Sequence, residues 1–294
     1  MALELGLEPN FFRRLERLTL LSRRLGAAPQ KGIRQSRSHG ASVEFADFRD
    51  YLPGDDTRFL DWNAYARLEK LFIKLFHEEA SLNLHLLIDT SASMGFGEPG
   101  KLTAAARMAA ALAYIALARL DAVTVAALPG AGAPPLSPRR GRRQIHAVLR
   151  FLRDLEAHGT LNLTPALRRY GSHPAQNALA VVISDFLDPD GCSEGLAYLR
   201  HRKFDVVMLH LLTPEELNPR FGGDRLLADV ETGTELDVTA SPRLFRRYQA
   251  ALREHGDGLE EFARRHGMAY ARVVTTTPLE EVVLTCLRQR RVLT

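Results

Sequence analysis

The sequence predicts an α/β fold: a doubly wound, mostly parallel sheet with helices on both faces, plus an N-terminal elaboration of short strands and a helix. Two observations carry this prediction. From residue 81 onward, near-continuous apolar runs of strand length alternate with helical patterns, which is typical of a parallel sheet covered on both faces. In addition, 46% of the 294 residues are hydrophobic and 25% are charged, as in globular proteins with a substantial core.

The expected strands are short apolar runs bounded by turn residues or helical patterns. They lie at residues 82–89, 121–128, 178–186, 204–212 and 268–275. A further segment, residues 227–239, predicts a hairpin that turns at Thr232, Gly233 and Thr234. These strands supply the predicted sheet and one appended hairpin.

The expected helices follow from apolar residues at helical spacing. They lie at residues 101–120, 139–157, around 193–201, at 242–266, and from Pro278 onward. The first is apolar nearly all the way round, so we expect it to be buried. The fourth should be interrupted near Gly256 and Gly258, because glycine weakens a helix interior.

The first 80 residues read differently from residues 81–294, so we place a domain boundary between them. Residues 11–25 predict an amphipathic helix, and the Gly/Ser/Arg-rich residues 26–42 predict a loop. Residues 43–79 mix aromatic, acidic and arginine side chains without a sustained period. We expect short strands and turns there.

Composition and charge exclude several classes of protein. The net charge of +4 is no nucleic-acid signature, and the run of arginines at 139–143 is better read as a solvated helix face. The longest charge-free apolar stretch, residues 108–118, is shorter than the ~20 residues of a membrane helix. The first ten residues lack the basic and apolar regions of a signal peptide. We therefore expect a cytoplasmic protein without a membrane span.

Polar side chains follow two of the predicted strands at their carboxyl ends. Asp89, Ser91 and Ser93 form a D-x-S-x-S cluster after the first strand, and Asp185 ends the strand at 178–186. If these strands are neighbours at a point where the strand order reverses, both aspartates open into one crevice. Carboxylate and hydroxyl oxygens suit a hard cation, so we expect Mg²⁺, with Mn²⁺ and Ca²⁺ left open.

At these residues the sequence resembles the von Willebrand factor A-like domain, whose metal-ion-dependent adhesion site begins with D-x-S-x-S. The preceding segment RSHGASVEFADFRDYLPGDDTRFLDWNAYARLEKLFIKLFHEE looks like the lead-in of the bacterial domain of unknown function 58 family. That family carries a von Willebrand A-like, Rossmann-like domain and is often encoded beside MoxR-type AAA+ ATPases. The resemblance extends from about Arg37 to the end of the chain.

The resemblance implies a ligand set. Asp89, Ser91 and Ser93 would supply the first loop, and Asp185 would act through water. The family pattern G-T-D/N-L has an extra residue in GTLNLT at 159–164, so Thr160 is the first choice for the threonine ligand and Thr164 is the fallback.

The activity that the resemblance implies is non-enzymatic, metal-bridged protein recognition. A partner's acidic residue would displace a metal-bound water. The implied partner is a MoxR-type AAA+ ATPase in the chaperone-like assembly or maturation of other proteins.

A second contact surface is expected in the N-terminal part. It is a dense polar and aromatic set that could equally fix this segment to the main domain through ion pairs, and the residues around Pro53 also read as a plain turn. The set is Asp55, Asp56, Arg58, Asp61, Trp62 and Arg67.

Two alternatives compete with the interaction module. The segment SASMG at 91–95 partly imitates the nucleophile elbow of serine hydrolases, although the first glycine is missing and the helix starts late. Alternatively, the chain is a structural domain that binds no metal, since Asp and Ser after a strand are often turn or cap residues. Cys192 and Cys286 lie far apart without ligand spacing and indicate neither a zinc site nor a disulfide.

Overall fold

The computed structural model describes Leu15 and residues 44–53, 57, 60–77, 82–128, 134–172 and 177–283. The described residues fall into two compact units, a smaller one within 29–81 and a larger one that includes 82–283 and Leu15. Leu15 is helical and buried. The rest of the helix predicted at 11–25 and the loop predicted at 26–42 lie outside the described residues.

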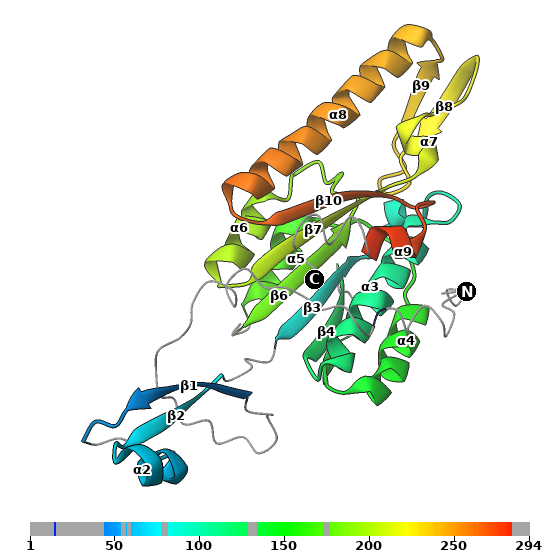
Figure 1. The fold of residues 1–294 in the computed structure, drawn as a ribbon. Coiled ribbons are helices and arrows are strands. Elements are labelled where there is room, and N and C mark those ends of the chain that lie inside the picture. Colours follow the sequence, from blue (N-terminus) through cyan, green and yellow to red (C-terminus); the bar gives the residue numbers. More distant parts are fainter. Residues whose placement is uncertain are drawn as a thin grey trace. The chain divides into compact units, whose positions relative to one another are not determined.

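A six-stranded sheet in the order β10-β7-β6-β3-β4-β5 forms the centre of the larger unit (Figure 1). All neighbouring pairs are parallel except β4 with β5, which are antiparallel. The mixed α/β architecture with a mostly parallel sheet is thus confirmed. The strands are β3 (Asn83–Asp89), β4 (Ala122–Leu128), β5 (Leu136–Arg139), β6 (Ala178–Ser184), β7 (Asp205–Leu212) and β10 (Ala269–Val274).

The strand order reverses at β3. Its successor in the chain, β4, pairs on one side of it, and β6 pairs on the other side. The condition that the strand ending at Asp89 neighbours the strand that precedes Asp185 is therefore met. In doubly wound sheets, binding crevices form outside the carboxyl ends of the strands at such a reversal.

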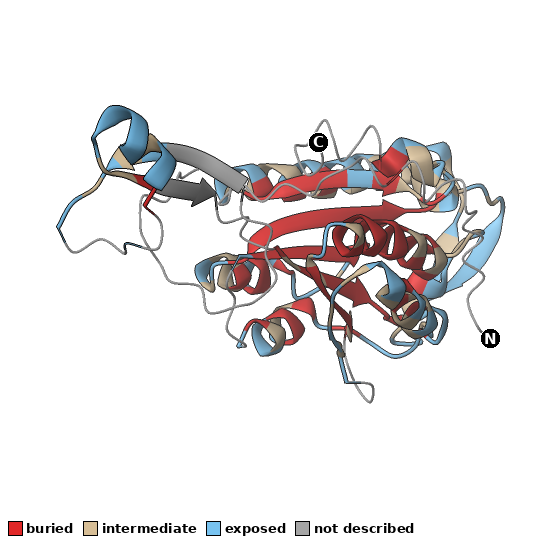
Figure 2. Cartoon of the chain, turned by 60° about the horizontal axis from the view of Figure 1, so that its bottom comes forward, coloured by how far each residue is buried: buried red, intermediate tan, exposed pale blue. Residues whose placement is uncertain are grey.

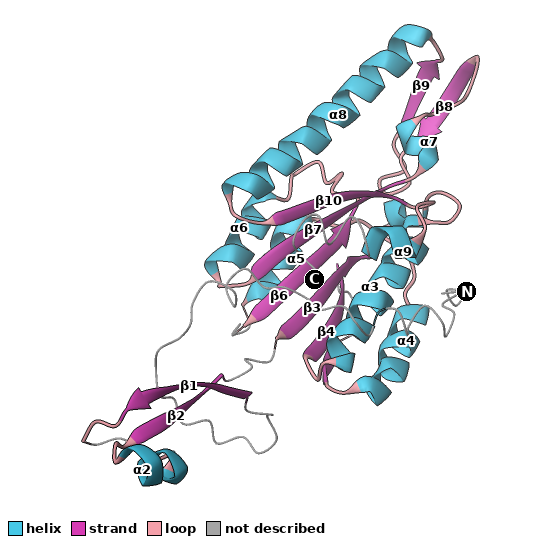
Figure 3. Cartoon of the chain, in the orientation of Figure 1, coloured by secondary structure: helices cyan, strands magenta, loops and turns pink. Residues whose placement is uncertain are grey.

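Helices cover both faces of the sheet, and each face has its own buried apolar cluster (Figures 2 and 3). One cluster includes side chains of α3 (Lys101–Ala118) and α4 (Ile145–Arg153). The other includes side chains of three helices, which are α5 (Leu163–Gly171), α6 (Ser193–His201) and α8 (Pro242–Arg265). Short helical turns occur at η2 (Ala92–Gly95), η3 (Arg142–Gln144), α7 (Pro214–Leu217) and α9 (Leu279–Glu281).

Helix α3 is the central helix of the first cluster. Nearly all of its residues are buried, and this agrees with its apolar sequence. Within the described residues it is the one helix long and apolar enough to cross a membrane by length and composition, and 78% of it is buried inside the unit. Packing against the sheet therefore accounts for its apolar surface.

The interruption predicted in the helix at 242–266 is wrong, since α8 continues through Gly256 and Gly258. Gly256 is buried where α8 crosses β10. A Cβ atom there would lie 3.2 Å from a guanidinium nitrogen of Arg272 and 3.6 Å from the hydroxyl of Tyr270. We infer that the glycine allows the helix to approach the strand, and that this packing outweighs its low helix propensity.

The helix predicted at 139–157 is also wrong at its start. Residues 136–139 form the short edge strand β5, and α4 begins only at Ile145. Gly141, between them, has a φ of 85°, a left-handed conformation that ends the strand and separates it from the helix.

The smaller unit contains β1 (Glu44–Asp50) paired antiparallel with β2 (Phe72–His77). Between them lies helix α2 (Trp62–Leu68), where only strands and turns were expected. The signal for this helix is Asp61, whose carboxylate accepts the backbone N–H groups of Asn63 and Ala64 as an N-cap. In the larger unit, the predicted hairpin is formed by β8 (Asp224–Ala228) and β9 (Glu235–Thr239).

Candidate functional site

Three of the predicted ligands, Asp89, Ser91 and Ser93, come together at the carboxyl end of β3. The Ser91 hydroxyl donates to Oδ1 of Asp89 at 2.7 Å, and the Ser91 backbone N–H donates to the same oxygen at 2.8 Å. The hydroxyl oxygens of Ser91 and Ser93 lie 3.0 Å apart. The tight turn of the D-x-S-x-S segment thus gathers a carboxylate and two hydroxyls in one place.

The second carboxylate oxygen of Asp89 contacts β6. Because Ile88 pairs with Ile183, Asp89 and Ser184 lie side by side, and the Ser184 hydroxyl donates to Oδ2 of Asp89 at 2.6 Å. Ser184 is a site residue that the sequence reasoning missed. Its signal was its position on the same strand face as Val182, one residue before Asp185.

Asp89 is a buried carboxylate held by neutral groups. Among the described residues, its hydrogen-bond partners are hydroxyls and one N–H, with no Lys or Arg. Burial and, to a smaller extent, the charge of nearby Asp185 together raise the pKa of Asp89 to about 6, against the opposing effect of the hydrogen bonds from Ser184 and Ser91. Within the part of the chain that the structure describes, ionised Asp89 therefore has no Lys or Arg among its hydrogen-bond partners.

Asp185 has a different partner. Its Oδ2 lies 2.6 Å from the ammonium nitrogen of Lys101, and its Oδ1 accepts the Leu187 N–H at 3.3 Å. Lys101 also lies 2.6 Å from Oε1 of Glu216, and its side chain is only 1% exposed. Sequence reasoning missed both Lys101 and Glu216. The signal for Lys101 was a charge at the start of a helix otherwise predicted to be buried.

The capping box of α7 orients Glu216. Its Oε2 accepts the N–H of Thr213 at 2.8 Å, and its own N–H donates to the Thr213 hydroxyl at 3.1 Å. Burial alone would lower the pKa of Lys101, but the charges of Asp185 and Glu216 outweigh it and raise that pKa. Lys101 is therefore a fixed, protonated cation at this edge.

The first-choice threonine lies on a loop bonded to the D-x-S-x-S turn. The Ala92 N–H donates to the carbonyl of Gly159 at 2.9 Å, and the His158 N–H donates to the carbonyl of Thr90 at 2.9 Å. Thr160 follows directly and is exposed. These two bonds bring the backbone before Thr160 next to the serines.

The fallback threonine is engaged elsewhere. The hydroxyl of Thr164, on α5, donates to the carbonyl of Gly191 at 3.0 Å. It would have to release this bond before it could reach a cation. The geometry therefore favours Thr160 over Thr164 as the candidate ligand.

A histidine continues the polar row across the sheet. His210 of β7 pairs in register with Ser184, and its Nδ1 lies 2.8 Å from the Tyr270 hydroxyl. Burial lowers the pKa of His210 to about 3, so the ring is neutral. Its Nε2 has no partner among the described residues. We assign His210 to the packing beneath the edge.

The donor chemistry fits a hard cation. Asp89, Ser91 and Ser93 offer converging oxygens, and Asp185 lies close enough to influence the pKa of Asp89. No group of three or more His, Cys, Asp or Glu side chains able to hold a metal occurs among the described residues. The candidate set depends instead on hydroxyls, while Lys101 engages the second carboxylate.

The predicted second surface is described only in part, because Asp55, Asp56 and Arg58 lie outside the described residues. Asp61 is buried and caps α2, so its carboxylate serves the helix. Trp62 is 63% exposed, and its ring meets that of Tyr65 edge to face, with centroids 6.4 Å apart. Arg67 is exposed in the last turn of α2. The structure thus brings Trp62 and Arg67 to one short, exposed helix.

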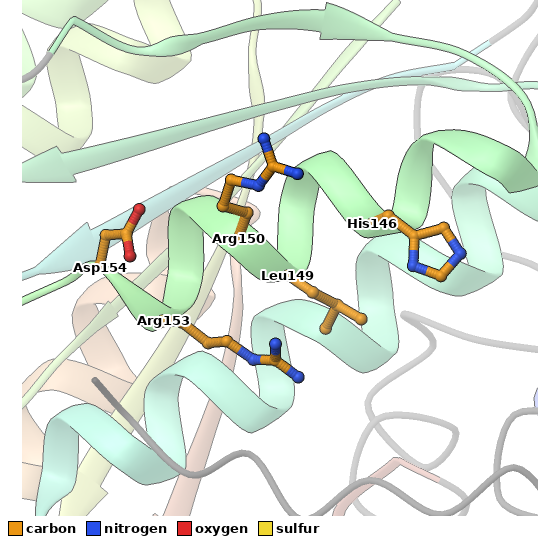
Figure 4. A pocket seen from close by; sticks show the side chains of 5 residues that line it. All are labelled: His146, Leu149, Arg150, Arg153 and Asp154. Atoms are coloured by element: carbon orange, nitrogen blue, oxygen red, sulfur yellow. The ribbon is translucent and has the colours of Figure 1, made fainter.

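A pocket of about 360 Å³ lies along α4, and none of the predicted ligands is among its described lining residues (Figure 4). Its lining comes from successive turns of one helix and from Asp154 just after it. The lining residues are His146, Leu149, Arg150, Arg153 and Asp154. Among the described residues, this hollow on the outer face of α4 therefore brings together no groups from separate helices or strands.

The chain is similar in sequence to bacterial proteins. The chain is 28% identical over 224 residues to the uncharacterized protein Rv1480 of Mycobacterium tuberculosis, covering 74% of this chain and 69% of that protein. It is 42% identical over 66 residues to the uncharacterized protein YeaD of Bacillus subtilis, covering 22% of this chain and 16% of YeaD.

Two solved structures are matched over most of their length. BatB from Bacteroides thetaiotaomicron has a TM-score of 0.45 and 15% identity, with 71% of this chain and 98% of BatB covered. An aerotolerance-related membrane protein from Bacteroides fragilis has a TM-score of 0.45 and 16% identity, with the same coverage. The sequence of this chain also matches the family described as "Protein of unknown function DUF58" over residues 47–258. The chain therefore belongs to the DUF58 family.

Proposed function

We propose that this chain is a cytoplasmic, non-enzymatic module that binds a protein partner through a divalent cation at the end of β3. In this proposal the larger unit is a von Willebrand A-like domain, and Asp89, Ser91, Ser93, Thr160 and Asp185 form its adhesion-type site. The cation is Mg²⁺, with Mn²⁺ or Ca²⁺ as substitutes.

One observation carries the proposal. At the reversal point of the sheet, a buried carboxylate with a raised pKa is surrounded by hydroxyls and has no cationic partner among the described residues. Such a carboxylate costs folding free energy unless a positive charge joins it. A divalent cation beside Asp89 would supply that charge.

The chain's own residues divide the work. Asp89 supplies the charge of the site, and its hydrogen bonds with Ser91 and Ser184 hold both of its oxygens in place. Ser93, which is partly exposed, and Thr160, which is exposed, border the side from which a partner would approach. A bound Mg²⁺ would supply coordination positions that a partner's carboxylate can take from water.

The partner is proposed to be a protein that presents an acidic residue. The family resemblance points to a MoxR-type AAA+ ATPase, with this chain as its adaptor in the assembly or maturation of other proteins. The exposed Trp62 and Arg67 of α2 offer a second contact, because tryptophan and arginine are enriched among the residues that dominate binding energy.

The serine hydrolase alternative has less support. The Ser91 hydroxyl donates to a carboxylate, and among the described residues no histidine hydrogen-bonds Ser91 or Ser93. A nucleophilic serine needs a base within hydrogen-bond reach. The site offers oxygen ligands more readily than a nucleophile and base.

Calorimetric titration of chelator-treated protein with MgCl₂ tests the metal site. We expect binding in the wild type and its loss in Asp89→Ala and Ser93→Ala. The variant Asp224→Ala, which removes an exposed carboxylate from β8, is the matched control and should bind as the wild type does. Equal binding in all four proteins would contradict the site. No binding in the wild type would favour a structural domain without metal.

Capture of the ATPase tests the partner. We expect the purified MoxR-type ATPase to bind the wild type in Mg²⁺. This binding should be lost in EDTA and in the variant Asp89→Ala. Capture by Trp62→Ala should be weaker while its Mg²⁺ binding is unchanged. Full capture in EDTA would refute a metal-bridged contact.

A further inference from the structure

We propose that Lys101 is a built-in competitor of the divalent cation: its ammonium group neutralises Asp185 in the metal-free protein and thereby weakens cation binding at the edge. This inference rests on the proposed metal site and adds the residue that sets its affinity.

The contacts of Lys101 are those of a counterion. Its ammonium nitrogen lies 2.6 Å from Asp185 and 2.6 Å from Glu216, and its side chain is almost completely buried. A lysine ammonium has three donors, so these two contacts engage most of its capacity. Burial of a charge is tolerated only with such partners.

The charge balance leaves room for one divalent ion. Ionised Asp89, Asp185 and Glu216 carry three negative charges, and Lys101 carries one positive charge. The cluster therefore lacks two positive charges. One Mg²⁺ would balance it. Lys101 lies on the Asp185 side only, since the described hydrogen bonds of Asp89 are to hydroxyls and an N–H. The deficit is therefore concentrated around Asp89.

Asp185 is the point of competition. A cation that binds Asp89 and reaches Asp185, directly or through water, must share that carboxylate with the ammonium group and is repelled by it. Glu216 gives Lys101 a second place to bind, and the capping box holds Glu216 there. Lys101 can thus loosen its bond to Asp185 without losing every counter-charge.

Two substitutions should move cation affinity in opposite directions. Lys101→Met removes the competitor and keeps the length of the side chain, so we expect Mg²⁺ to bind about tenfold more tightly. Glu216→Gln removes the second partner of Lys101, so the ammonium group binds Asp185 more firmly and Mg²⁺ should bind several-fold more weakly. Lys70→Met, which removes an exposed lysine from the smaller unit, should leave the affinity unchanged.

The experiment is calorimetric titration of the full chain with MgCl₂ after chelator treatment, with thermal unfolding in Mg²⁺ and in EDTA as a second readout. We expect Mg²⁺ to raise the melting temperature of Lys101→Met more than that of the wild type. If Lys101→Met does not fold in EDTA, the double variant Lys101→Met/Glu216→Gln replaces it, because this variant leaves one fewer unpaired carboxylate. Its Mg²⁺ affinity is then compared with that of Glu216→Gln alone. Lys101→Arg keeps the charge and should retain near wild-type affinity.

The outcomes separate this inference from the proposed function. Wild-type binding that is lost in Asp89→Ala but equal or weaker in Lys101→Met would overturn the role of Lys101 and leave the metal site standing. Absence of Mg²⁺ binding in the wild type and in Lys101→Met would overturn both.

Discussion

The ends of β3 and β6 place an aspartate at almost the same level of the sheet but give the two carboxylates different partners. Asp89 is surrounded by the hydroxyls of Ser91 and Ser184, whereas Asp185 is paired with the buried ammonium of Lys101. Both side chains are almost fully buried. The difference lies in charge compensation, because hydroxyls orient a carboxylate but cannot neutralise it.

This contrast suggests a division of labour at the edge of the sheet. Asp185 is satisfied by the fold itself, through an ion pair that ties α3 to β6 and to α7. Under the proposed function, Asp89 is the carboxylate that a divalent cation would neutralise. Removing the cation from Asp185 should therefore lower stability, whereas removing the unpaired charge of Asp89 should raise stability and abolish metal binding.

The largest expected effect is on stability at the Asp185 side. Lys101→Ala in EDTA leaves the buried Asp185 and the partly buried Glu216 without their cation. We therefore expect a loss of about 3–5 kcal/mol in the free energy of unfolding, measured by urea denaturation. The control is Arg168→Ala, which breaks an exposed pair with Glu194 and should cost less than about 1 kcal/mol. Equal losses in the two variants would show that burial of the Lys101 pair is energetically unimportant.

The opposite effect is expected at Asp89. A pKa of about 6, raised from 3.8, means that the folded protein binds more protons than the unfolded chain between these values. The contribution of Asp89 to stability is therefore fully present below pH 4, falls as the pH rises to 6, and is absent above it. The loss corresponds to about 3 kcal/mol.

Asp89→Asn isolates this contribution. In EDTA at pH 7 the variant should be more stable than the wild type, by up to about 3 kcal/mol, and the difference should shrink toward pH 4. Urea denaturation at several pH values measures it, and Asp224→Asn on the exposed hairpin is the control. Parallel stability profiles for Asp89→Asn and the wild type would refute an uncompensated Asp89.

A smaller effect distinguishes the two serines that contact Asp89. Ser184→Ala removes a buried donor to the carboxylate and an acceptor of the Phe186 N–H, so we expect a stability loss of about 2 kcal/mol. Ser91→Ala keeps its backbone N–H bond to Asp89 and should cost about 1 kcal/mol, but it should weaken Mg²⁺ binding more than Ser184→Ala does. Denaturation measures the stability losses and calorimetry measures the Mg²⁺ affinities. A larger loss of Mg²⁺ affinity in Ser184→Ala than in Ser91→Ala would contradict the prediction.

The smallest effect separates the two candidate threonines. Thr160→Ala should weaken Mg²⁺ binding several-fold and change the free energy of unfolding by less than about 0.5 kcal/mol, because Thr160 is exposed. Thr164→Ala should leave Mg²⁺ binding unchanged, since its hydroxyl contacts Gly191. Calorimetry on both variants decides between them, and loss of binding in Thr164→Ala alone would reverse the assignment.

Much of the fold could be predicted from local patterns. The five buried parallel strands and the helix at Lys101–Ala118 follow from continuous apolar runs. A strand that is buried on both faces of the sheet has no alternation of apolar and polar residues. The failures occurred where tertiary contacts overrode local preference. Edge strand β5 depends on pairing with β4, and Gly256 is tolerated in α8 because the helix approaches β10 there.

The sequence by itself determined the cluster of Asp89, Ser91 and Ser93, because residues two apart in a tight turn after a strand are brought together by local geometry alone. Only the tertiary structure decided what surrounds the two aspartates. Ser184 reaches Asp89 across 95 residues, and Lys101 reaches Asp185 across 84 and Glu216 across 115. Such contacts arise from strand order and helix packing, and no spacing along the chain encodes them directly.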